Sequence, residues 1–488
     1  MDKKVVVIGA GFGGLSAAAL LAKEGHDVTL IEKNWDVGGR GMQFKENGYT
    51  FDMGPSWYLM PEAFDNFFEE MGTSTEKELD LIRLDPAYRV FFSDETIDIR
   101  KDLDKNLETF EKLEPGVTDT FMEYLDKAEM KYEISLDEVL YKDYKKYTDF
   151  FTMRLLKEGL KLDILTNMDS YLKKKFKSKK LRQILLYTVV FLGSVPKKTP
   201  GVYSLMSHAD FNLGVYYPKG GMNGVAKAMA EVGKRHGLKI KLNTPVEKIV
   251  TKDGKVRGVQ TEDEFIKADI VVGNADYHHV ETQLLEKEDR SYKEKYWKKK
   301  TMAPSALLLY LGVDKKIPEL DHHNLIFKDD WEAHFETVFN KKEWPKDFHL
   351  YVCKPTQTEP EMAPEGKENL FALLPLAPGL EDDKETIEEY TDKIIALIEE
   401  VTGNKFKDDI EYQKAFGPSD FKDTFNAYKG TALGLAHTMM QTAVLRPKHR
   451  SKKVKNLYYT GHYTHPGIGV PMVIISGHIV RDIIKNDK

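Results

Sequence analysis

The 488-residue sequence predicts an α/β fold with a parallel sheet assembled from separated segments of the chain. A wholly apolar run at residues 5–8 leads directly into a glycine-rich turn and a helical pattern. Strand-like segments recur within residues 239–273, and another strand, glycine-rich turn and helix occupy residues 457–484. Short apolar strands are typical of parallel sheets covered on both faces. At roughly 150 residues per domain, the length predicts about three structural units.

The first motif indicates a site for a dinucleotide. Gly9, Gly11 and Gly14 fill the pattern G-x-G-x-x-G, and the strand at residues 27–31 ends in Glu32, near the spacing at which an acidic residue is expected. Glycines let the backbone approach a pyrophosphate, the helix N-terminus supplies free N–H groups, and the carboxylate can bind an adenosine ribose. A plain glycine turn at a tight helix–strand contact would not explain Glu32. The carboxylate also disfavours NADP, because it would repel a ribose 2′-phosphate.

A second glycine turn follows at residues 36–40 and ends in Arg40, whose planar fork suits a pyrophosphate held along its length. Residues 48–56 then predict a short strand and a sharp turn. This N-terminal region, with E-x5-G-G-R running from Glu32 to Arg40, resembles the FAD-dependent amine-oxidase-like flavoproteins. The resemblance implies FAD as cofactor and a Rossmann-type FAD-binding domain. Its candidate FAD-binding residues are Gly9, Gly11, Gly13, Gly14, Glu32, Lys33, Gly39, Arg40, Gly54, Pro55 and Ser56.

The middle of the chain is expected to return to this domain. A helix is predicted at residues 224–236, followed by strands at 239–242, 246–251, 256–260 and 270–273. In the resembled family the strand at Val246 contacts the adenine through its backbone, and Val246 takes that role by resemblance. A plain buried valine is the alternative interpretation of its side chain.

The C-terminal motif resembles the signature of the bacterial-type phytoene desaturases. The strand at residues 457–461 leads into a glycine-rich turn and a helix whose first turn carries Pro471. Such a helix N-terminus favours negative charge, which would suit the edge of a flavin ring that becomes negative on reduction. Residues 220–222, 441–443 and 446–447 match the same family, so the resemblance spans nearly the whole chain. It adds Gly461, Gly469, Val470 and Pro471 to the candidate FAD-binding residues.

Three residues depart from the family pattern. His462, Tyr463 and Ile468 stand where small residues are usual, and they are expected to reshape the pocket. The resemblance implies FAD-dependent desaturation of a long isoprenoid hydrocarbon, such as phytoene, by hydride transfer to flavin. The alternatives are a carotenoid isomerase, a retinol-type saturase or a carotenoid oxygenase of the same family, a polar amine or amino-acid oxidase, and a prenyl or lipid carrier without redox chemistry. No catalytic acid or base is identified.

The domains are predicted as follows. Residues 1–84, 206–281 and 441–488 form the FAD-binding domain, 85–205 a helical substrate and membrane-docking region, and 282–440 an α+β substrate-binding domain. Basic residues crowd positions 173–182, directly before the apolar stretch 184–195, a combination that suits anionic headgroups. A charged helix face followed by a core helix is the alternative. At 12 residues this stretch is too short to cross a membrane, so peripheral contact is expected.

The net charge, the cysteine count and the placement of histidines argue against a nucleic-acid partner, an extracellular location and a metal site. The chain has 72 basic and 78 acidic residues, a net charge of −6, which argues against a nucleic-acid partner. One cysteine, Cys353, and an N-terminus without a signal-peptide pattern indicate the cytoplasm. Neighbouring histidines at 278–279 and 322–323 are expected to point apart, so no metal site is predicted.

Overall fold

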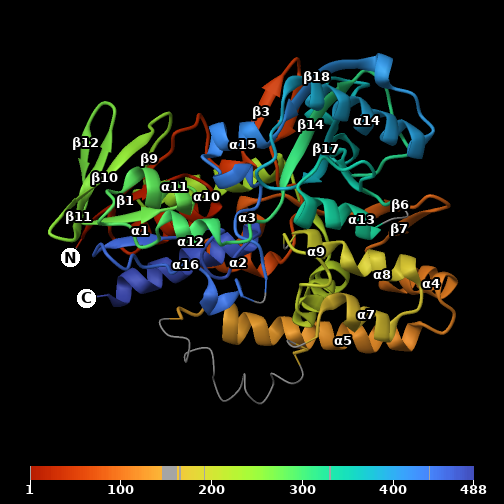
Figure 1. The fold of residues 1–488 in the computed structure, drawn as a ribbon, viewed down its shortest axis with the longest axis horizontal. Helices are drawn as coiled ribbons and strands as arrows, with labels where there is room; N and C mark the ends of the chain where they lie inside the picture. Colours follow the sequence, from red (N-terminus) through yellow and green to blue (C-terminus); the bar gives the residue numbers. More distant parts are fainter. Residues whose placement is uncertain are drawn as a thin grey trace.

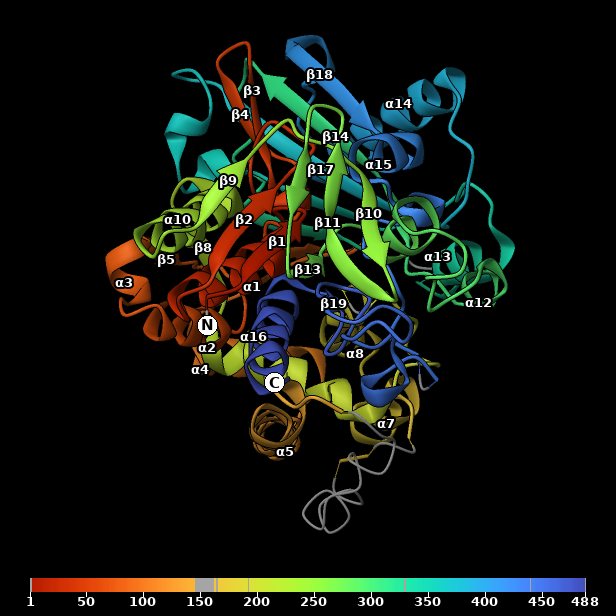
Figure 2. The ribbon, with the colours of Figure 1, turned by 90° about the vertical axis from the view of Figure 1, so that its left-hand side faces the viewer.

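Two large sheets organise the computed structural model, which describes residues 2–144, 162–163, 166–191, 193–328, 331–438 and 440–487. One sheet has five strands and the other has seven, and they lie in separate halves of the molecule (Figure 1). Both termini lie at the same side, in the half that holds the five-stranded sheet (Figures 1 and 2). Within the described ranges, none of the helices is long and apolar enough to span a bilayer.

The five-stranded sheet is parallel throughout, and its strand order is β19-β13-β1-β2-β9. Its strands come from three distant parts of the sequence: β1 (Lys4–Ile8), β2 (Asp27–Ile31), β9 (Lys239–Lys241), β13 (Ile270–Gly273) and β19 (Leu457–Tyr459). Since all five run the same way, their carboxyl ends meet at one edge, where α/β sheets bind ligands.

Both faces of this sheet are covered, which explains the wholly apolar strands. Val5 and Val7 of β1 pack against helices α1 (Phe12–Lys23), α10 (Gly221–Arg235) and α16 (Val470–Asn486). Val6 and Ile8 face the opposite way, into a cluster with the antiparallel sheet β10-β11-β12. The bounds of that sheet are β10 (Val246–Lys252), β11 (Lys255–Thr261) and β12 (Phe265–Lys267).

The seven-stranded sheet has the order β18-β14-β17-β16-β15-β6-β7 and is antiparallel except where β15 pairs with β6. Helix α14 (Lys384–Thr402) covers one face through Ile394, Ile395 and Ile398. The other face carries Leu308, Tyr310 and Tyr351. The strands are β6 (Tyr88–Phe91), β7 (Thr96–Ile99), β14 (Ser305–Val313), β15 (His323–Ile326), β16 (Leu350–Cys353), β17 (Glu368–Leu376) and β18 (Ile410–Phe416).

Two expectations for residues 85–205 are corrected here. The region begins with two strands rather than helices: β6 pairs with β15, and β7 pairs with β6 at the edge of the seven-stranded sheet. Its helices are α4 (Leu103–Leu113), α5 (Thr118–Ser135), α7 (Met168–Lys175), α8 (Lys179–Leu186) and α9 (Thr188–Phe191), drawn at the lower right of Figure 1. The side chains from Ile184 to Val189, in the described part of the apolar stretch, are buried core rather than a docking surface, and residue 192 lies outside the described residues.

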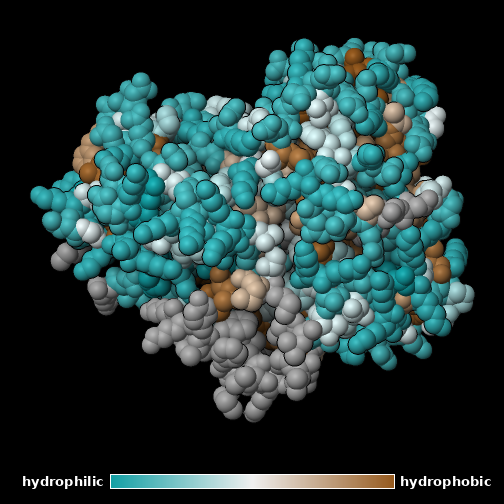
Figure 3. Space-filling view, viewed as in Figure 1, coloured by the Kyte–Doolittle hydropathy of each residue, from teal (hydrophilic) through white to brown (hydrophobic). Residues whose placement is uncertain are grey.

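The remaining elements connect these parts. They are β3 (Gln43–Glu46), β4 (Tyr49–Asp52), α2 (Pro61–Glu70), α3 (Thr75–Glu78), β5 (Leu81–Arg83), β8 (Tyr216–Pro218), α11 (Tyr277–His279), α12 (Glu294–Lys298), α13 (Trp331–Glu336) and α15 (Pro418–Phe425). The face shown in Figure 3 is mostly hydrophilic, and hydrophobic residues form small separate patches on it.

The buried carboxyl of Asp210 makes stability depend on pH. Asp210 is 5% exposed, accepts a hydrogen bond from the Tyr88 hydroxyl at 2.9 Å and contacts Tyr187, and burial raises its pKa to about 7. The folded state therefore binds this proton more tightly than the unfolded state does, so the contribution is complete below about pH 4 and is lost as pH rises through 7. With Asp210→Asn we expect the melting temperature to change less with pH between pH 5 and 8, where Asp210 contributes at most about 3 kcal/mol to the change in wild-type stability. Thermal melts at half-unit pH steps measure this; parallel pH curves for the two proteins would contradict it.

Candidate functional site

A single cavity of about 790 Å³ joins the carboxyl edge of the parallel sheet to the seven-stranded sheet. At one end lie Ile8 and Glu32, and at the other lie Leu308, Leu325 and Leu373. All the predicted FAD-binding residues except Gly14 line this cavity: Gly9, Gly11, Gly13, Glu32, Lys33, Gly39, Arg40, Gly54, Pro55, Ser56, Val246, Gly461, Gly469, Val470 and Pro471. The structure therefore brings together segments that stand more than 400 positions apart in the sequence.

The two glycine turns lie side by side at the start of α1. Gly11 is the N-cap residue of α1 and forms a bridge with Gly38, whose N–H donates to the Ala10 carbonyl at 2.8 Å. A Cβ added at Gly39, which has a φ of +58°, would lie 3.0 Å from the Gly11 Cα. At Gly14 an added Cβ would overlap the Gly9 carbonyl oxygen, so Gly14 serves the close packing of the turn rather than the cavity wall.

Glu32 is held rigidly at the end of β2. The side chain is 5% exposed, and its carboxylate accepts hydrogen bonds from the Ala10 N–H at 2.7 Å and the Asn34 N–H at 2.9 Å. Two backbone donors leave lone pairs on both oxygens for a hydroxyl in the cavity. The neighbouring Lys33 lines the cavity, but its ammonium donates to the Asp423 carbonyl at 2.6 Å.

The N-terminus of α16 opens on the same cavity as that of α1. Gly469 is its N-cap residue, Pro471 lies in its first turn, and both line the cavity. The two helices are joined by a hydrogen bond of 2.9 Å from the Ser16 hydroxyl to the Ile474 carbonyl. Two helix N-termini that face one cavity make it favourable for negative charge.

Two residues at this edge were missed by the sequence analysis. The amide of Asn274 donates to the Gly9 carbonyl at 3.0 Å and lies against Gly13, Gly14 and Gly461. Asp276 lines the cavity and accepts hydrogen bonds from backbone and hydroxyl donors. Asn274 follows directly on the buried strand β13 and Asp276 stands two residues later, so their position at a carboxyl strand end was the available signal.

An unpartnered buried donor shows that this end fits an anionic cofactor. The Arg40 Nη2 donates to the Thr431 carbonyl at 3.2 Å, while its Nε is buried and has no hydrogen-bond partner within the described ranges. Burial lowers the pKa of Arg40, although the nearby Asp276 opposes that shift. A cationic donor without an acceptor, beside two helix N-termini and a glycine cradle, fits the pyrophosphate of a dinucleotide.

The other end of the cavity is apolar. Side chains from the seven-stranded sheet, from residues 205–206, and from α13 and the turn after it form its walls: Leu205, Met206, Leu308, Leu325, Phe327, Phe335, Val338, Phe339 and Leu373. The polar atoms of Ser56 and Tyr351 satisfy each other with a hydrogen bond of 2.7 Å, and the Tyr351 hydroxyl lies 2.7 Å from His323 Nδ1. Such walls suit a hydrocarbon and exclude water from it.

The residues that depart from the family pattern are placed differently from one another. His462 and Ile468 line the cavity, as expected. Tyr463 is 2% exposed and turns into the core, where its hydroxyl donates to Asp276 Oδ2 at 2.7 Å. Arg446 supports this turn by donating to the carbonyls of His462 and Thr464 at 2.6 and 3.0 Å.

The prediction that His322 and His323 point apart is wrong. Their rings lie 4.6 Å apart, and their ligand atoms come within 4.8 Å of each other and of Cys353 Sγ. Only His323 belongs to β15, so the alternation of strand side chains does not separate the pair. Burial raises the pKa of the Cys353 thiol to about 12, which keeps it protonated.

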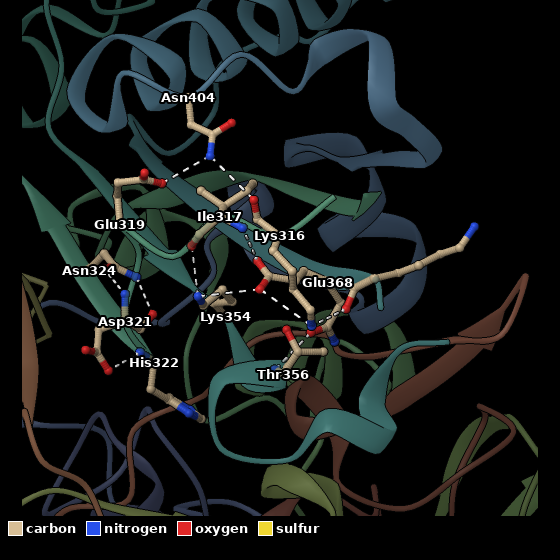
Figure 4. Close-up of polar contacts among 12 residues, drawn as sticks. Lys316, Ile317, Glu319, Asp321, His322, Asn324, Lys354, Thr356, Glu368 and Asn404 are labelled. Carbon is tan, nitrogen blue, oxygen red and sulfur yellow. Dashed lines mark hydrogen bonds and ion pairs between the residues drawn. The ribbon is translucent and has the colours of Figure 1, made fainter. Parts of the chain in front are cut away.

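A buried ion pair nearby is structural (Figure 4). Lys354 is 1% exposed, donates to the Ile317 carbonyl at 2.9 Å and lies 3.7 Å from Glu368. Glu368 accepts from the Ile317 N–H at 3.0 Å, so the pair fastens the connection between β14 and β15. In the part of the chain that is described, none of the residues labelled in Figure 4 lines the cavity.

Comparisons with known proteins agree with this arrangement. A family model for flavin containing amine oxidoreductases matches residues 12–480. The carotenoid 3,4-desaturase of Haloarcula japonica is 44% identical over 485 residues, covering 99% of this chain and 98% of that protein. The zeta-carotene-forming phytoene desaturase of Myxococcus xanthus is 33% identical, covering 98% of this chain and 93% of its own length.

Solved structures share the fold at low sequence identity. An oxidoreductase from Methanosarcina mazei superimposes with a TM-score of 0.62 at 19% identity and covers 99% of this chain and all of its own. Putrescine oxidase bound to putrescine superimposes with a TM-score of 0.60 at 15% sequence identity, and both chains are covered completely. The full-length matches, together with the cavity built from both ends of the sequence, place this chain in the carotenoid desaturase family of the flavin containing amine oxidoreductases.

Proposed function

We propose that this protein is an FAD-dependent enzyme that desaturates a long isoprenoid hydrocarbon, phytoene or a related carotenoid precursor. The observation that carries the proposal is the single cavity, whose one end suits a dinucleotide and whose other end suits a hydrocarbon. The similarity to a carotenoid 3,4-desaturase and to phytoene desaturases supports the same reaction class. When bound, FAD supplies the hydride acceptor that no side chain provides.

The residues of the chain have separate tasks in this proposal. Glu32 would hold the adenosine ribose, and the glycine turns with Arg40 would hold the pyrophosphate. The N-terminus of α16 at Gly469–Pro471 would stabilise negative charge at the ring edge. The apolar walls around Leu308 and Leu373 would orient the polyene and exclude water, and such positioning can contribute ~7–11 kcal/mol to a barrier.

The domain assignment follows from the same proposal. Residues 1–84, 206–281 and 441–488 would form a Rossmann-type FAD-binding domain, since every strand of the parallel sheet comes from them. Residues 282–440 would form the substrate-binding domain together with β6 and β7. This assignment puts the cavity between the two domains, where small-molecule sites are common.

Product spectra test the proposed reaction. The purified, FAD-loaded protein is incubated in liposomes with phytoene and, in parallel, with an already conjugated acyclic carotenoid. We expect the absorbance of at least one of them to move stepwise to longer wavelength as double bonds are added. A small shift would indicate isomerisation, a blue shift would indicate saturation, and a protein that stays colourless after FAD loading would contradict the cofactor.

We also propose peripheral membrane contact, because the substrate dissolves in a bilayer. Lys174 and Lys177 are exposed on and beside α7, whereas Lys180 is neutralised by ion pairs with Asp94 and Glu95. At ~1 kcal/mol per basic side chain, losing two lysines corresponds to ~2 kcal/mol, so the double variant Lys174→Glu, Lys177→Glu should bind anionic liposomes at least about 30-fold more weakly. Flotation measures binding, and Lys384→Glu, Lys405→Glu near the two ends of α14 is the control with the same charge change. Equal flotation of the two variants would count against this surface.

A further inference from the structure

His462 carries a buried nitrogen whose partner is missing. It follows Gly461 in the turn after β19, and its imidazole packs so closely on Gly434 that an added Cβ there would overlap the ring. The side chain lines the cavity, and Nε2 is buried without a hydrogen-bond partner among the described residues. Leaving such a group unsatisfied is unfavourable, so the position indicates a ligand that supplies the missing partner.

Arg40 reaches the same turn of the chain. Its Nη2 donates to the carbonyl of Thr431, and the Thr431 hydroxyl accepts the Gly434 N–H at 3.0 Å, which fixes residues 431–434 as one rigid turn. Arg40 Nε is the second buried nitrogen in this part of the cavity without a partner within the described ranges. Two such nitrogens therefore flank one short turn.

Asp276 does not satisfy these donors. Its two oxygens already accept from the N–H groups of His278, His279 and Tyr428 and from the Tyr463 hydroxyl, at 3.0, 3.3, 3.2 and 2.7 Å. No salt bridge joins Asp276 to Arg40 in the described part of the molecule. Tyr463 thus helps to keep the carboxylate occupied, and the donors of Arg40 and His462 stay available to the cavity.

The surroundings of His462 identify the part of the ligand that it meets. Gly461, its neighbour, comes within 3.3 Å of a Cβ added at Gly13, in the first turn of α1, and Gly39 lies against Gly11. The two donors therefore border the helix N-terminus at which a pyrophosphate is held. We infer that His462 Nε2 and Arg40 Nε donate two hydrogen bonds to the phosphate oxygens of FAD. This rests on the proposed function, because it requires that the cavity binds FAD.

The imidazole acts in its neutral form. Burial, together with the positive charges of Arg40 and Arg446, holds the pKa of His462 well below its usual range. A neutral imidazole carries one N–H, and the tautomer with its proton on Nε2 is the one that donates into the cavity. A small residue at position 462 would leave Arg40 as the single side-chain donor at this point.

Ligand fragments separate this role from a structural one. FAD, ADP and riboflavin are titrated into the apoprotein of the wild type and of His462→Phe, His462→Ala and His462→Gln, and calorimetry gives each Kd. The Phe variant keeps a ring against Gly434 without an N–H, and the Gln variant restores a donor near Nε2. Removing the donor should raise the Kd of FAD and of ADP by the same factor, roughly 10- to 100-fold, and leave the Kd of riboflavin unchanged. In His462→Gln the affinity for FAD and ADP should recover in part.

The controls distinguish failure of this inference from failure of the proposed function. His236→Ala removes an exposed imidazole outside the cavity and should leave all three affinities unchanged. Unaltered ADP binding in His462→Phe, or an equal loss of riboflavin, would overturn the phosphate contact while leaving FAD binding by the wild type intact. A wild-type apoprotein that binds neither FAD nor ADP would overturn both proposals.

Discussion

Gly11→Val should abolish the retention of flavin by the purified protein. Gly11 is the N-cap residue of α1 and lies between the two glycine turns, so a branched side chain there would occupy the space in which a pyrophosphate approaches the backbone. The Gly11 backbone has φ −68° and ψ 169°, a region that any residue adopts. An added Cβ meets only the Asn274 amide, at 3.3 Å, and the Gly39 Cα, at 4.0 Å. The chain should therefore fold and lose its cofactor.

The measurement is the ratio of flavin absorbance to protein absorbance after gel filtration, with circular dichroism and thermal melting as the test of folding. Gly11→Ala should retain an intermediate amount. Gly14→Ala is the informative comparison, because its Cβ would overlap the Gly9 carbonyl oxygen, and we expect that variant to lose stability as well as flavin. A folded Gly11→Val protein that purifies yellow would show that the first glycine turn does not hold the cofactor.

Leu373→Trp should remove the activity while the flavin stays bound. Leu373 lies on β17, lines the apolar end of the cavity and is only partly buried, so the larger ring can extend into the cavity. A filled channel cannot hold the polyene in the orientation that reaction requires, and we expect kcat/KM to fall at least about 100-fold, equivalent to about 2.7 kcal/mol. Product formation from phytoene in liposomes measures this.

Leu373→Met is the matched control, since it preserves volume and apolar character and should change activity little. The flavin-to-protein ratio of both variants should equal that of the wild type, because Leu373 lies away from the glycine turns. Wild-type activity in Leu373→Trp would place the substrate elsewhere, and loss of flavin in that variant would contradict the division of the cavity into two ends.

The candidate site was predictable where local sequence carries a chemical requirement. The glycine turns, Glu32 and the C-terminal turn were predicted as parts of one site, and all the predicted FAD-binding residues except Gly14 line one cavity. Asn274 and Asp276 escaped notice because a single polar residue after a strand has no spacing pattern of its own. The turn at residues 431–434 could not be predicted as part of the site, because its place beside Arg40 depends on a contact between residues almost 400 positions apart.

The errors have the same origin. Strands β6 and β7 were assigned to a helical region because their sequence does not show that β6 pairs with β15, which lies more than 200 positions later. The basic residues beside an apolar stretch were compatible with a docking surface or with a charged helix before a core segment, and only packing shows that Ile184–Val189 are buried. The two adjacent histidines were expected to point apart because side chains alternate along a strand. This rule does not apply to them, since His322 lies just before β15 and only His323 belongs to it.

Short-range chemistry specifies the glycine turns, the helix starts and the strands buried on both faces, and these could be predicted from neighbouring residues alone. Which of these elements meet, which buried nitrogens lack a partner and where the apolar wall lies became apparent only in the folded chain. The reason is physical. Local conformation depends on neighbouring residues, whereas a cavity is defined by side chains that become neighbours only after the chain has folded.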